Sequence, residues 1–236
     1  MYHLITGGSS GLGYEIAKLL IKMDEPVIIL GRNVDKLESA RKSLQAISAN
    51  ADVLSYSIDI SDGDDVDAFI GTLETAGKTI KHLYNVAGTT YYGPVTAISR
   101  EDIDAVLQSN MIGLMLFTSK MTGHLLKQPQ DEKRIISVLS TAALIGKKNE
   151  TIYNAAKWGA RGYLESLRDE LMGTNIEIIN VFPGGMKTAF WADSASGYDV
   201  DNFMDPVDVA RNIVRIAMDT KVYVTDITIK RPVART

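Results

Sequence analysis

The chain has 236 residues, 45% of them hydrophobic and 23% charged, with a net charge of −4. These values are typical of one globular α/β domain and indicate no general attraction to nucleic acid or to anionic membranes. The absence of cysteine excludes disulfides, thiolate catalysis and Cys-based zinc sites, and the three histidines lack the spacing of metal ligands, so no metal is expected. No apolar run reaches the ~18 residues of a membrane span. The first predicted strand starts at Met1 and leaves no room for a signal peptide, so a cytoplasmic protein is expected.

The chain begins with a short apolar run at residues 2–6, which predicts a strand. The glycine-rich segment TGGSSGLG at residues 6–13 follows directly, and apolar residues then recur at helical spacing over residues 15–23. When a strand, a glycine-rich loop and a helix follow one another, the glycines let the backbone approach a phosphate, and the helix N-terminus supplies free N–H groups. The start of the chain therefore predicts a phosphate-binding loop.

Strands and helices alternate along the rest of the chain, and Ser61 and Ser99 are predicted N-caps. This alternation predicts βαβ units, and hence a single-domain Rossmann-type doubly wound parallel sheet of about seven strands with helices on both faces. The one domain spans residues 1–236, and its segment 188–205 lacks periodicity and is expected to form a substrate loop. The further strands are predicted at 26–30, 53–58, 82–86, 133–139, 176–182 and 221–229, and the further helices at 35–47, 61–76, 99–127, 150–172 and 206–218.

Tyr153 and Lys157 lie four residues apart in the predicted helix 150–172, so both side chains point to one side of it. A cation beside a phenol favours the phenolate and lowers the pKa of the tyrosine. The pair is therefore a candidate for giving or taking a proton near neutral pH.

Six motifs occur in one order along the chain: TGGSSGLG at 6–13, NVAG at 85–88, Asn110, Ser140, Tyr153-x3-Lys157, and PGGMKT at 183–188. Together they resemble the classical short-chain dehydrogenase/reductase family. The matches are to its TGxxxGxG loop, its NNAG segment with Val86 in place of the second Asn, its helix Asn, its active-site Ser 13 residues before the Tyr, its catalytic pair and its PGxxxT segment. The resemblance covers nearly the whole chain.

The resemblance implies an oxidoreductase that transfers a hydride between a nicotinamide and a carbonyl or secondary alcohol. Tyr153 would be the general acid or base, and Ser140 would bind and orient the same oxygen. Lys157 would lower the pKa of Tyr153 and bind the nicotinamide ribose. Asn110 would hold a water that links Lys157 to solvent.

The end of the second predicted strand indicates which cofactor is used. Residues 31–33 read Gly-Arg-Asn without the carboxylate that binds the ribose 2′-OH of NAD, and Arg32 suits a 2′-phosphate. We therefore predict a preference for NADP(H), with NAD(H) as the alternative, although Ser10 stands where the family often has Arg. The predicted cofactor-binding residues are Gly7, Ser9, Ser10, Gly11, Leu12, Gly13, Arg32, Asn33, Asp59, Ile60, Asn85, Ala87, Gly88, Tyr153, Lys157, Pro183, Gly184, Met186 and Thr188.

The segments 89–95, 142–151 and 190–204 are expected to form the substrate pocket. Lys147 and Lys148 either attract an anionic substrate or are a solvated surface pair. The aromatic residues of these segments favour an apolar or aromatic ligand, or else pack the loops onto the body. They are Tyr91, Tyr92, Phe190, Trp191, Tyr198 and Phe203.

Two other functions stay open at this point. A non-catalytic dinucleotide-sensing protein needs no proton donor, and an S-adenosylmethionine-dependent methyltransferase leaves Tyr153, Lys157 and Arg32 unexplained. A small-molecule substrate is the expected partner, with no nucleic acid and no membrane. The resemblance also implies a homo-dimer or homo-tetramer paired through the helices of Asn110 and Tyr153. Apolar residues on these helices supply that surface or face the sheet instead: Leu114, Phe117, Trp158 and Leu164.

Overall fold

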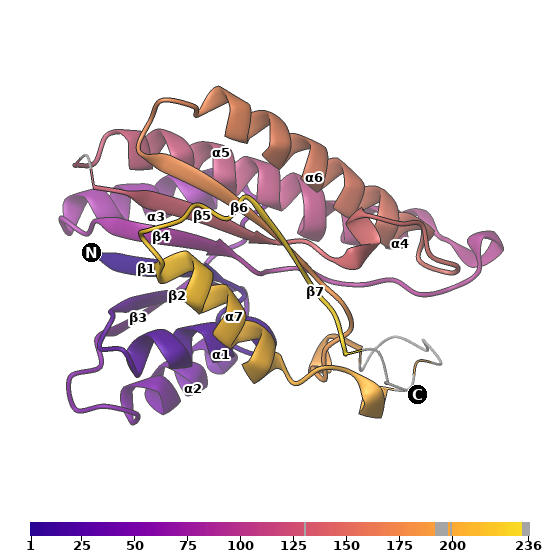
Figure 1. Ribbon diagram of the computed structural model, residues 1–236, viewed down its shortest axis with the longest axis horizontal. Coiled ribbons are helices and arrows are strands. Elements are labelled where there is room, and N and C mark those ends of the chain that lie inside the picture. The colour runs from indigo at the N-terminus through magenta and orange to yellow at the C-terminus, as the bar shows by residue number, and fades with distance from the viewer. Residues whose placement is uncertain (130, 192–197, 199, 233–236) are drawn as a thin grey trace.

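The computed structural model describes residues 1–129, 131–191, 198 and 200–232. The strands in this part of the chain are β1 (Tyr2–Thr6), β2 (Val27–Gly31), β3 (Val53–Ser57), β4 (Ile80–Asn85), β5 (Lys133–Val138), β6 (Ile176–Pro183) and β7 (Asp226–Ile229). All are parallel and form one sheet in the order β3-β2-β1-β4-β5-β6-β7 (Figure 1). The order reverses between β1 and β4, which creates a crevice at their carboxyl ends. The predicted doubly wound parallel sheet is confirmed.

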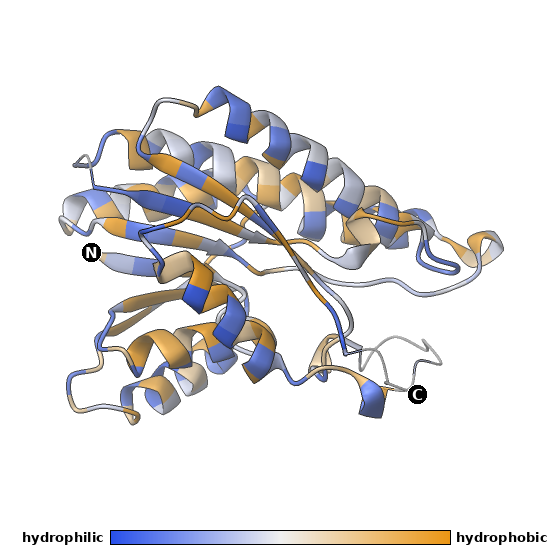
Figure 2. Ribbon diagram, in the orientation of Figure 1, coloured by the Kyte–Doolittle hydropathy of each residue, from blue (hydrophilic) through white to orange (hydrophobic). Residues whose placement is uncertain are grey.

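The helices are α1 (Gly11–Ile21), α2 (Val34–Gln45), α3 (Gly63–Thr75), α4 (Arg100–Leu107), α5 (Gly113–Leu126), α6 (Thr151–Glu170) and α7 (Pro206–Met218). Helices α1, α2 and α7 pack on one face of the sheet, whereas α3, α5 and α6 pack on the other, with α4 against α6 (Figure 1). Apolar residues gather on the helix sides that face the sheet, and polar residues lie on the outer sides (Figure 2). This amphipathic pattern is what holds each helix in its layer.

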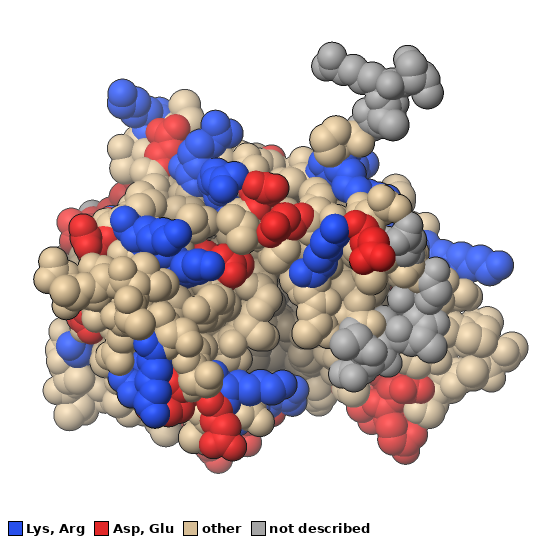
Figure 3. Space-filling view, turned by 90° about the horizontal axis from the view of Figure 1, so that it is seen from below, with Lys and Arg blue, Asp and Glu red and all other residues tan. Residues whose placement is uncertain are grey.

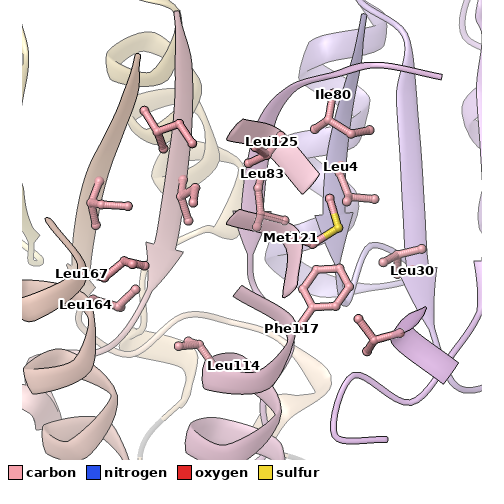
Figure 4. Close-up of a cluster of buried hydrophobic side chains, with 14 of the residues drawn as sticks. Leu4, Leu30, Ile80, Leu83, Leu114, Phe117, Met121, Leu125, Leu164 and Leu167 are labelled. Atoms are coloured by element: carbon pink, nitrogen blue, oxygen red, sulfur yellow. The ribbon is translucent and has the colours of Figure 1, made fainter. Parts of the chain in front are cut away.

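The core between the sheet and helices α5 and α6 is formed by large aliphatic and aromatic side chains (Figure 4). Leu4 and Leu83 project from the sheet, and Phe117, Met121 and Leu164 project from the helices; all five are fully buried. Each such side chain stabilises the fold by about 1.5–3 kcal/mol relative to an exposed one. The paired strands and helices are thereby fixed to one another.

This packing answers the question that the sequence left open about the apolar residues of α5 and α6. Leu114, Phe117 and Leu164 are buried against the sheet, whereas half of Trp158 is exposed. Of these four residues, only Trp158 is therefore available to an oligomer interface.

The predicted N-cap at Ser99 is confirmed, whereas the one at Ser61 is wrong. Ser99 and Asp102 form a reciprocal capping box at the start of α4. Asp62 caps α3 instead of Ser61, because its carboxylate accepts from the N–H groups of Asp64 and Asp65. The Ser61 hydroxyl donates to Asp59 at 2.7 Å and is not available as a cap.

Three element boundaries differ most from the sequence-based expectation, and the others agree within about two residues. Helix α1 begins at Gly11, so residues 11–13 of the glycine-rich segment belong to its first turn. The long predicted helix 99–127 is interrupted by a π-helical turn at Gln108–Ile112, which separates α4 from α5. The last strand begins at Asp226 rather than at residue 221, because its ladder with β6 starts where Asn180 pairs with Asp226.

Candidate active site

A cavity of about 820 Å³ lies at the carboxyl edge of the sheet, above the crevice between β1 and β4. Its walls come from the glycine-rich segment, from the ends of β4, β5 and β6, and from the start of α6. The structure thus brings together most of the predicted site residues: Gly7, Ser10, Gly11, Leu12, Gly13, Ala87, Gly88, Ser140, Tyr153, Lys157, Pro183, Gly184, Met186 and Thr188.

The glycine-rich segment forms a backbone cradle in which side chains do not fit. Gly7 has φ +69°, and a Cβ there would lie 3.0 Å from the backbone of Ala87. A Cβ on Gly13 would lie 2.4 Å from the carbonyl oxygen of Gly7. The first turn of α1 therefore starts directly at the cavity wall, where its free N–H groups and positive dipole end suit a phosphate.

The cradle is fixed to the neighbouring strand by Thr6 at the end of β1. Its hydroxyl oxygen accepts from the N–H groups of Val86 and Ala87, at 3.0 and 3.1 Å. Two segments that are 80 residues apart in the chain are therefore held at one place. This contact keeps the crevice between β1 and β4 in register.

Tyr153 lies in the first turn of α6 and is buried, at 5% exposure. Burial raises the pKa of its phenol, hydrogen bonding with Ser140 opposes this shift, and the negative charge of Glu150 adds to it. The sequence predicted that Lys157 lowers this pKa, whereas the net shift in this structure is upward because the phenol is buried. The Lys157 ammonium lies 5.7 Å from the ring centroid.

Lys157 is one turn further along α6 and is also buried, at 4% exposure. Its ammonium donates to the Val138 carbonyl oxygen at 3.2 Å. Burial lowers the pKa of Lys157 to about 8, because the charged form loses its hydration. At neutral pH the side chain is still mainly charged, and it points into the cavity.

Asn110 belongs to the π-helical turn and does not line the cavity itself, but its side chain lies next to Gly88 of the cavity wall. Its amide nitrogen donates to the carbonyl oxygens of Thr89 and Val106, at 2.8 and 3.0 Å. Its Oδ1 is buried without a hydrogen-bond partner. A Cβ on Gly88 would lie 2.6 Å from this oxygen and 3.8 Å from the Lys157 ammonium nitrogen. The glycine thus leaves a small space that is shared by an unpaired acceptor and a cation.

Ser140 follows β5 and precedes a short helical turn at Thr141–Ala143. Its Oγ accepts from the Ala142 N–H at 3.0 Å, which orients the hydroxyl beside Tyr153. Both side chains line the same cavity. Their arrangement suits two donors that meet at one oxygen of a bound molecule.

Six of the predicted cofactor-binding residues do not line the cavity. The Arg32 side chain is 74% exposed and lies 4.0 Å from Asp59. The Asn33 side chain caps α2, and the Asn85 side chain donates to Thr118 and Ser137, so both amides have structural partners. The residues outside the cavity wall are Ser9, Arg32, Asn33, Asp59, Ile60 and Asn85.

Several cavity residues were missed by sequence reasoning. Lys36 lies one turn after Asn33 in α2, and a lysine in that position has no motif of its own. Glu150 precedes α6 and lies in the predicted pocket segment 142–151, but it was not singled out, because an acidic residue there is typical of an ordinary helix start. Lys230 and Arg231 follow β7, and no pattern in the chain predicts that they reach the site.

The substrate side of the cavity has an aromatic wall, as the sequence indicated. Phe190, Trp191, Tyr198 and Phe203 line it, and Trp191 contacts the other three with ring centroids 5.4 to 5.5 Å apart. Of the predicted segment 188–205, residues 192–197 and 199 lie outside the described part of the chain. Tyr91 and Tyr92 do not line the cavity, although the Tyr92 ring contacts that of Tyr198 at 5.1 Å.

The molecular surface gives little further indication of a macromolecular partner. Lys and Arg are intermixed with Asp and Glu over the face shown in Figure 3. Among the described residues, no group of His, Asp or Glu has the arrangement of a metal site. The same part of the chain contains no helix that is long and apolar enough to span a membrane.

Comparison with known proteins shows the family of this chain. The family model for short chain dehydrogenases matches residues 2–199. The chain is 27% identical to 3-oxoacyl-acyl-carrier-protein reductase FabG of Thermotoga maritima over 230 residues, which is 94% of this chain and 92% of that protein. A short-chain dehydrogenase/reductase from Vibrio parahaemolyticus superposes with a TM-score of 0.81 at 29% identity, covering 98% of this chain and 100% of that one.

A second solved structure extends the likeness of fold. An alcohol dehydrogenase from the archaeon Thermococcus sibiricus, complexed with 5-hydroxy-NADP, superposes with a TM-score of 0.86 at 19% identity and 98% coverage of both chains. A doubly wound parallel sheet with a glycine cradle at its switch point defines a Rossmann-type α/β protein. Because the family model matches most of its length, this chain belongs to the short chain dehydrogenase family of oxidoreductases.

Proposed function

We propose that this protein is an NADP(H)-dependent oxidoreductase that interconverts a carbonyl and a secondary alcohol. The observation that carries the proposal is that Ser140, Tyr153 and Lys157 line the same cavity as the glycine cradle, with the Asn110 side chain next to Gly88 of its wall. Such a cavity holds a dinucleotide and a small substrate side by side. The nicotinamide supplies or accepts the hydride when the cofactor is bound.

Tyr153 is the proton donor for the substrate oxygen in this proposal. Its raised pKa keeps the phenol protonated at neutral pH, which suits reduction of a carbonyl, because negative charge develops on the oxygen. Ser140 donates to the same oxygen and orients it. The two hydroxyls replace the hydrogen bonds to water that the substrate loses on entry.

Lys157 and Asn110 form the route by which Tyr153 regains its proton. The unpaired Oδ1 of Asn110 and the Lys157 ammonium both border the space beside Gly88, which suits a water that bridges them. In the proposal, Lys157 also binds the nicotinamide ribose hydroxyls. A sensing protein has no use for this arrangement, which favours the enzyme over the non-catalytic alternative.

The preference for NADP(H) follows from charge around the cradle. Residues 31–33 carry no carboxylate to bind the 2′-OH of NAD. Arg32 is exposed beside the end of β2, and Lys36 lines the cavity on the same side, so both are available to a 2′-phosphate. The archaeal alcohol dehydrogenase of the same fold was solved with an NADP derivative, which agrees with this proposal. NAD(H) is the alternative.

We also propose a homo-oligomer that pairs through the outer sides of α5 and α6. Half of the Trp158 side chain is exposed on α6, and Ile112 is 38% exposed at the end of the π-helical turn. Exposed large apolar groups on neighbouring elements are typical of a protein contact. Light scattering measures the mass in solution, and a monomer would contradict this part of the proposal.

The proposed function is tested by binding and turnover together. Fluorescence titration is expected to show micromolar or tighter binding of NADPH and at least ~10-fold weaker binding of NADH. A panel of ketones and aldehydes is then screened for oxidation of NADPH by its absorbance. Binding of NADPH without any turnover would favour the sensing protein, and lack of NADPH binding would favour the methyltransferase.

A further inference from the structure

A buried carboxylate lies at the substrate end of the cavity and is not used by the proposed proton transfer. Glu150 is the residue before α6, is 1% exposed, and lines the cavity. Its Oε1 accepts from the Tyr198 hydroxyl, whereas its Oε2 has no hydrogen-bond partner. The Lys147 ammonium lies 3.8 Å from Oε2, which is too far for a hydrogen bond. A buried carboxylate oxygen in this position favours an additional donor, because burial removed its water.

The position of Glu150 relative to Tyr153 indicates where that donor lies. The two residues are three apart at the start of α6, so their Cβ atoms are ~5–6 Å apart on one side of the helix. The Glu150 charge also contributes to the raised pKa of Tyr153, so the carboxylate acts directly on the phenol. A group bound to Glu150 is therefore only a few bonds from the carbon whose oxygen meets Tyr153.

The aromatic wall beside Glu150 suits the same kind of ligand. The rings of Trp191, Tyr198 and Phe203 have centroids 5.4 to 5.8 Å apart and face one cavity. Aromatic faces attract cations, most strongly where water is excluded. The Arg231 guanidinium already lies 5.8 Å from the Phe203 ring centroid. A carboxylate and an aromatic wall at one place are the two elements that bind alkylammonium groups.

Resting on the proposed function, we infer that the substrate is an amino ketone or the matching amino alcohol. Its protonated amine lies between Glu150 and the aromatic wall, and its carbonyl oxygen meets Tyr153 and Ser140. The amine donates its N–H to the free Oε2 of Glu150. The reaction at the carbonyl is unchanged, and Glu150 determines which ketones are accepted.

Five cations in the described part of the chain line this cavity. Lys157 is buried and already donates to the Val138 carbonyl oxygen, and Lys36 belongs to α2. The other three, Lys147, Lys230 and Arg231, favour an anionic substrate. Their charges are more strongly screened than that of Glu150. The Lys147 side chain is 29% exposed against 2% for the Glu150 side chain, and Arg231 is exposed and donates to the Asn202 carbonyl oxygen at 2.7 Å. A dry charge contributes more to binding than a hydrated one, so the observations favour the amine.

The test compares two ketones that differ only in charge. The probes are 4-dimethylaminobutan-2-one and its carbon analogue 5-methylhexan-2-one, with NADPH at neutral pH. The wild type is expected to prefer the amine by about 10–100-fold in kcat/KM, mostly through KM. Glu150→Gln keeps the shape and the bond to Tyr198, and is expected to bring the ratio of the two values close to one. Glu150→Asp keeps the charge and is expected to restore part of the preference.

Because Glu150 also acts on Tyr153, the ratio between the two ketones is the readout rather than either rate alone. Lys147→Met is the matched control, since it removes the cation beside Oε2, and it is expected to keep or increase the preference for the amine. An equal ratio in the wild type and in Glu150→Gln would overturn the inference, as would a preference of the wild type for the keto acid levulinate over both ketones.

Calorimetric titration of the protein with NADP⁺ and each ketone measures the same preference without turnover. Tighter binding of the amine that Glu150→Gln abolishes supports the inference even if neither ketone is reduced. Equal binding of the two ketones overturns it. Failure of the proposed function looks different, because then no carbonyl in the wider panel oxidises NADPH whatever its charge.

Discussion

The carboxyl and amino edges of the sheet both bury titratable side chains, but they use them differently. At the carboxyl edge, Tyr153 and Lys157 line a cavity beside the unpaired Oδ1 of Asn110. At the amino edge, His3 and His82 lie side by side with ring centroids 5.2 Å apart, and neither lines that cavity. Perturbed pKa values alone therefore do not distinguish an active site from a structural cluster.

The amino edge is organised around Arg134, which is 2% exposed. Its guanidinium donates to Glu177 at 2.8 Å and to the carbonyl oxygens of Ile216 and Ala217 near the end of α7, at 2.9 and 3.1 Å. Its backbone N–H donates to His82 at 3.0 Å. Arg134 thus joins β4, β5, β6 and α7. The polar groups of the amino edge are thus hydrogen-bonded within the protein, whereas those of the carboxyl edge line a cavity and are available to a ligand.

The largest expected effect is on turnover, and it comes from a substitution at the carboxyl edge. Tyr153→Phe removes the proposed proton donor and is expected to lower kcat by about 10³-fold while Tm and the Kd for NADPH stay close to wild type. Steady-state kinetics, thermal denaturation and fluorescence titration measure the three quantities. Tyr163→Phe, on the same helix with its hydroxyl on the Met115 carbonyl, is the control and should keep kcat. A near-native rate in Tyr153→Phe would refute the assigned role.

At the other edge, the expected effect is on stability instead. Arg134→Met leaves Glu177 and three carbonyl oxygens at the end of α7 without their donor and is expected to cost about 3–5 kcal/mol of unfolding free energy. The folded fraction should retain the wild-type kcat. Denaturant unfolding measures the loss, and Arg211→Met, at an exposed pair with Asp208, is the control with little expected effect. A variant as stable as wild type would show that the amino edge is not a structural cluster.

The two buried histidines predict a dependence of stability on pH. Burial lowers the pKa of His3 to about 4 and that of His82 to about 2, below the ordinary value near 6.5 in the unfolded chain. Below pH 6.5 the unfolded chain therefore binds protons that the folded protein does not, so stability is present above that pH and falls toward pH 4. Each histidine contributes a slope of about 1.4 kcal/mol per pH unit.

Denaturant unfolding at several pH values measures this slope in the wild type and in a matched variant. His82→Asn keeps an acceptor for the Arg134 N–H and removes one titrating group. Its stability should therefore fall less steeply between pH 6.5 and 4.5. Identical slopes in both proteins would exclude His82 as a source of the pH dependence.

Replacement of Lys157 is expected to change stability and activity in opposite directions. Its pKa is lowered to about 8 by burial, so at neutral pH the fold bears the cost of a buried ammonium. That cost decreases only as the pH rises above the folded pKa. Lys157→Met is expected to gain about 1–3 kcal/mol of stability at pH 7 and to lose turnover. Thermal denaturation and kinetics test this, and a destabilised variant would mean that the bond to Val138 outweighs the burial cost.

The smallest expected effect concerns the cofactor. Lys36→Met removes the cavity lysine of α2 and is expected to weaken NADPH binding by about 10-fold without changing that of NADH. Lys42→Met, on the same helix with its side chain 69% exposed, is the control. Equal losses for both cofactors would show that Lys36 does not contact a 2′-phosphate.

Much of the fold followed from local patterns in the sequence. The alternation of apolar runs and amphipathic helices predicts the parallel sheet, and the observed α7 has the predicted bounds 206–218. The capping box at Ser99 is also local. These features depend on residues within one or two turns of each other, so a single sequence carries them.

Which residues come together at the site was only partly predictable from the sequence. Motif order predicted that Ser140, Tyr153 and Lys157 share one place, and they line one cavity. Three features have no local signal: the π-helical turn that contains Asn110, the cavity position of Lys36 and the unpaired oxygen of Glu150. Each depends on which elements pack together across the sheet.

By itself, the sequence determined the order of strands and helices, the glycines of the cradle and the chemical groups available for proton transfer. Tertiary structure decided the environment of those groups. Burial raises the pKa of Tyr153 where adjacency to Lys157 predicted a lower one, since desolvation depends on the whole surrounding volume and not on a spacing of four residues. The same burial leaves Oε2 of Glu150 without a hydrogen-bond partner.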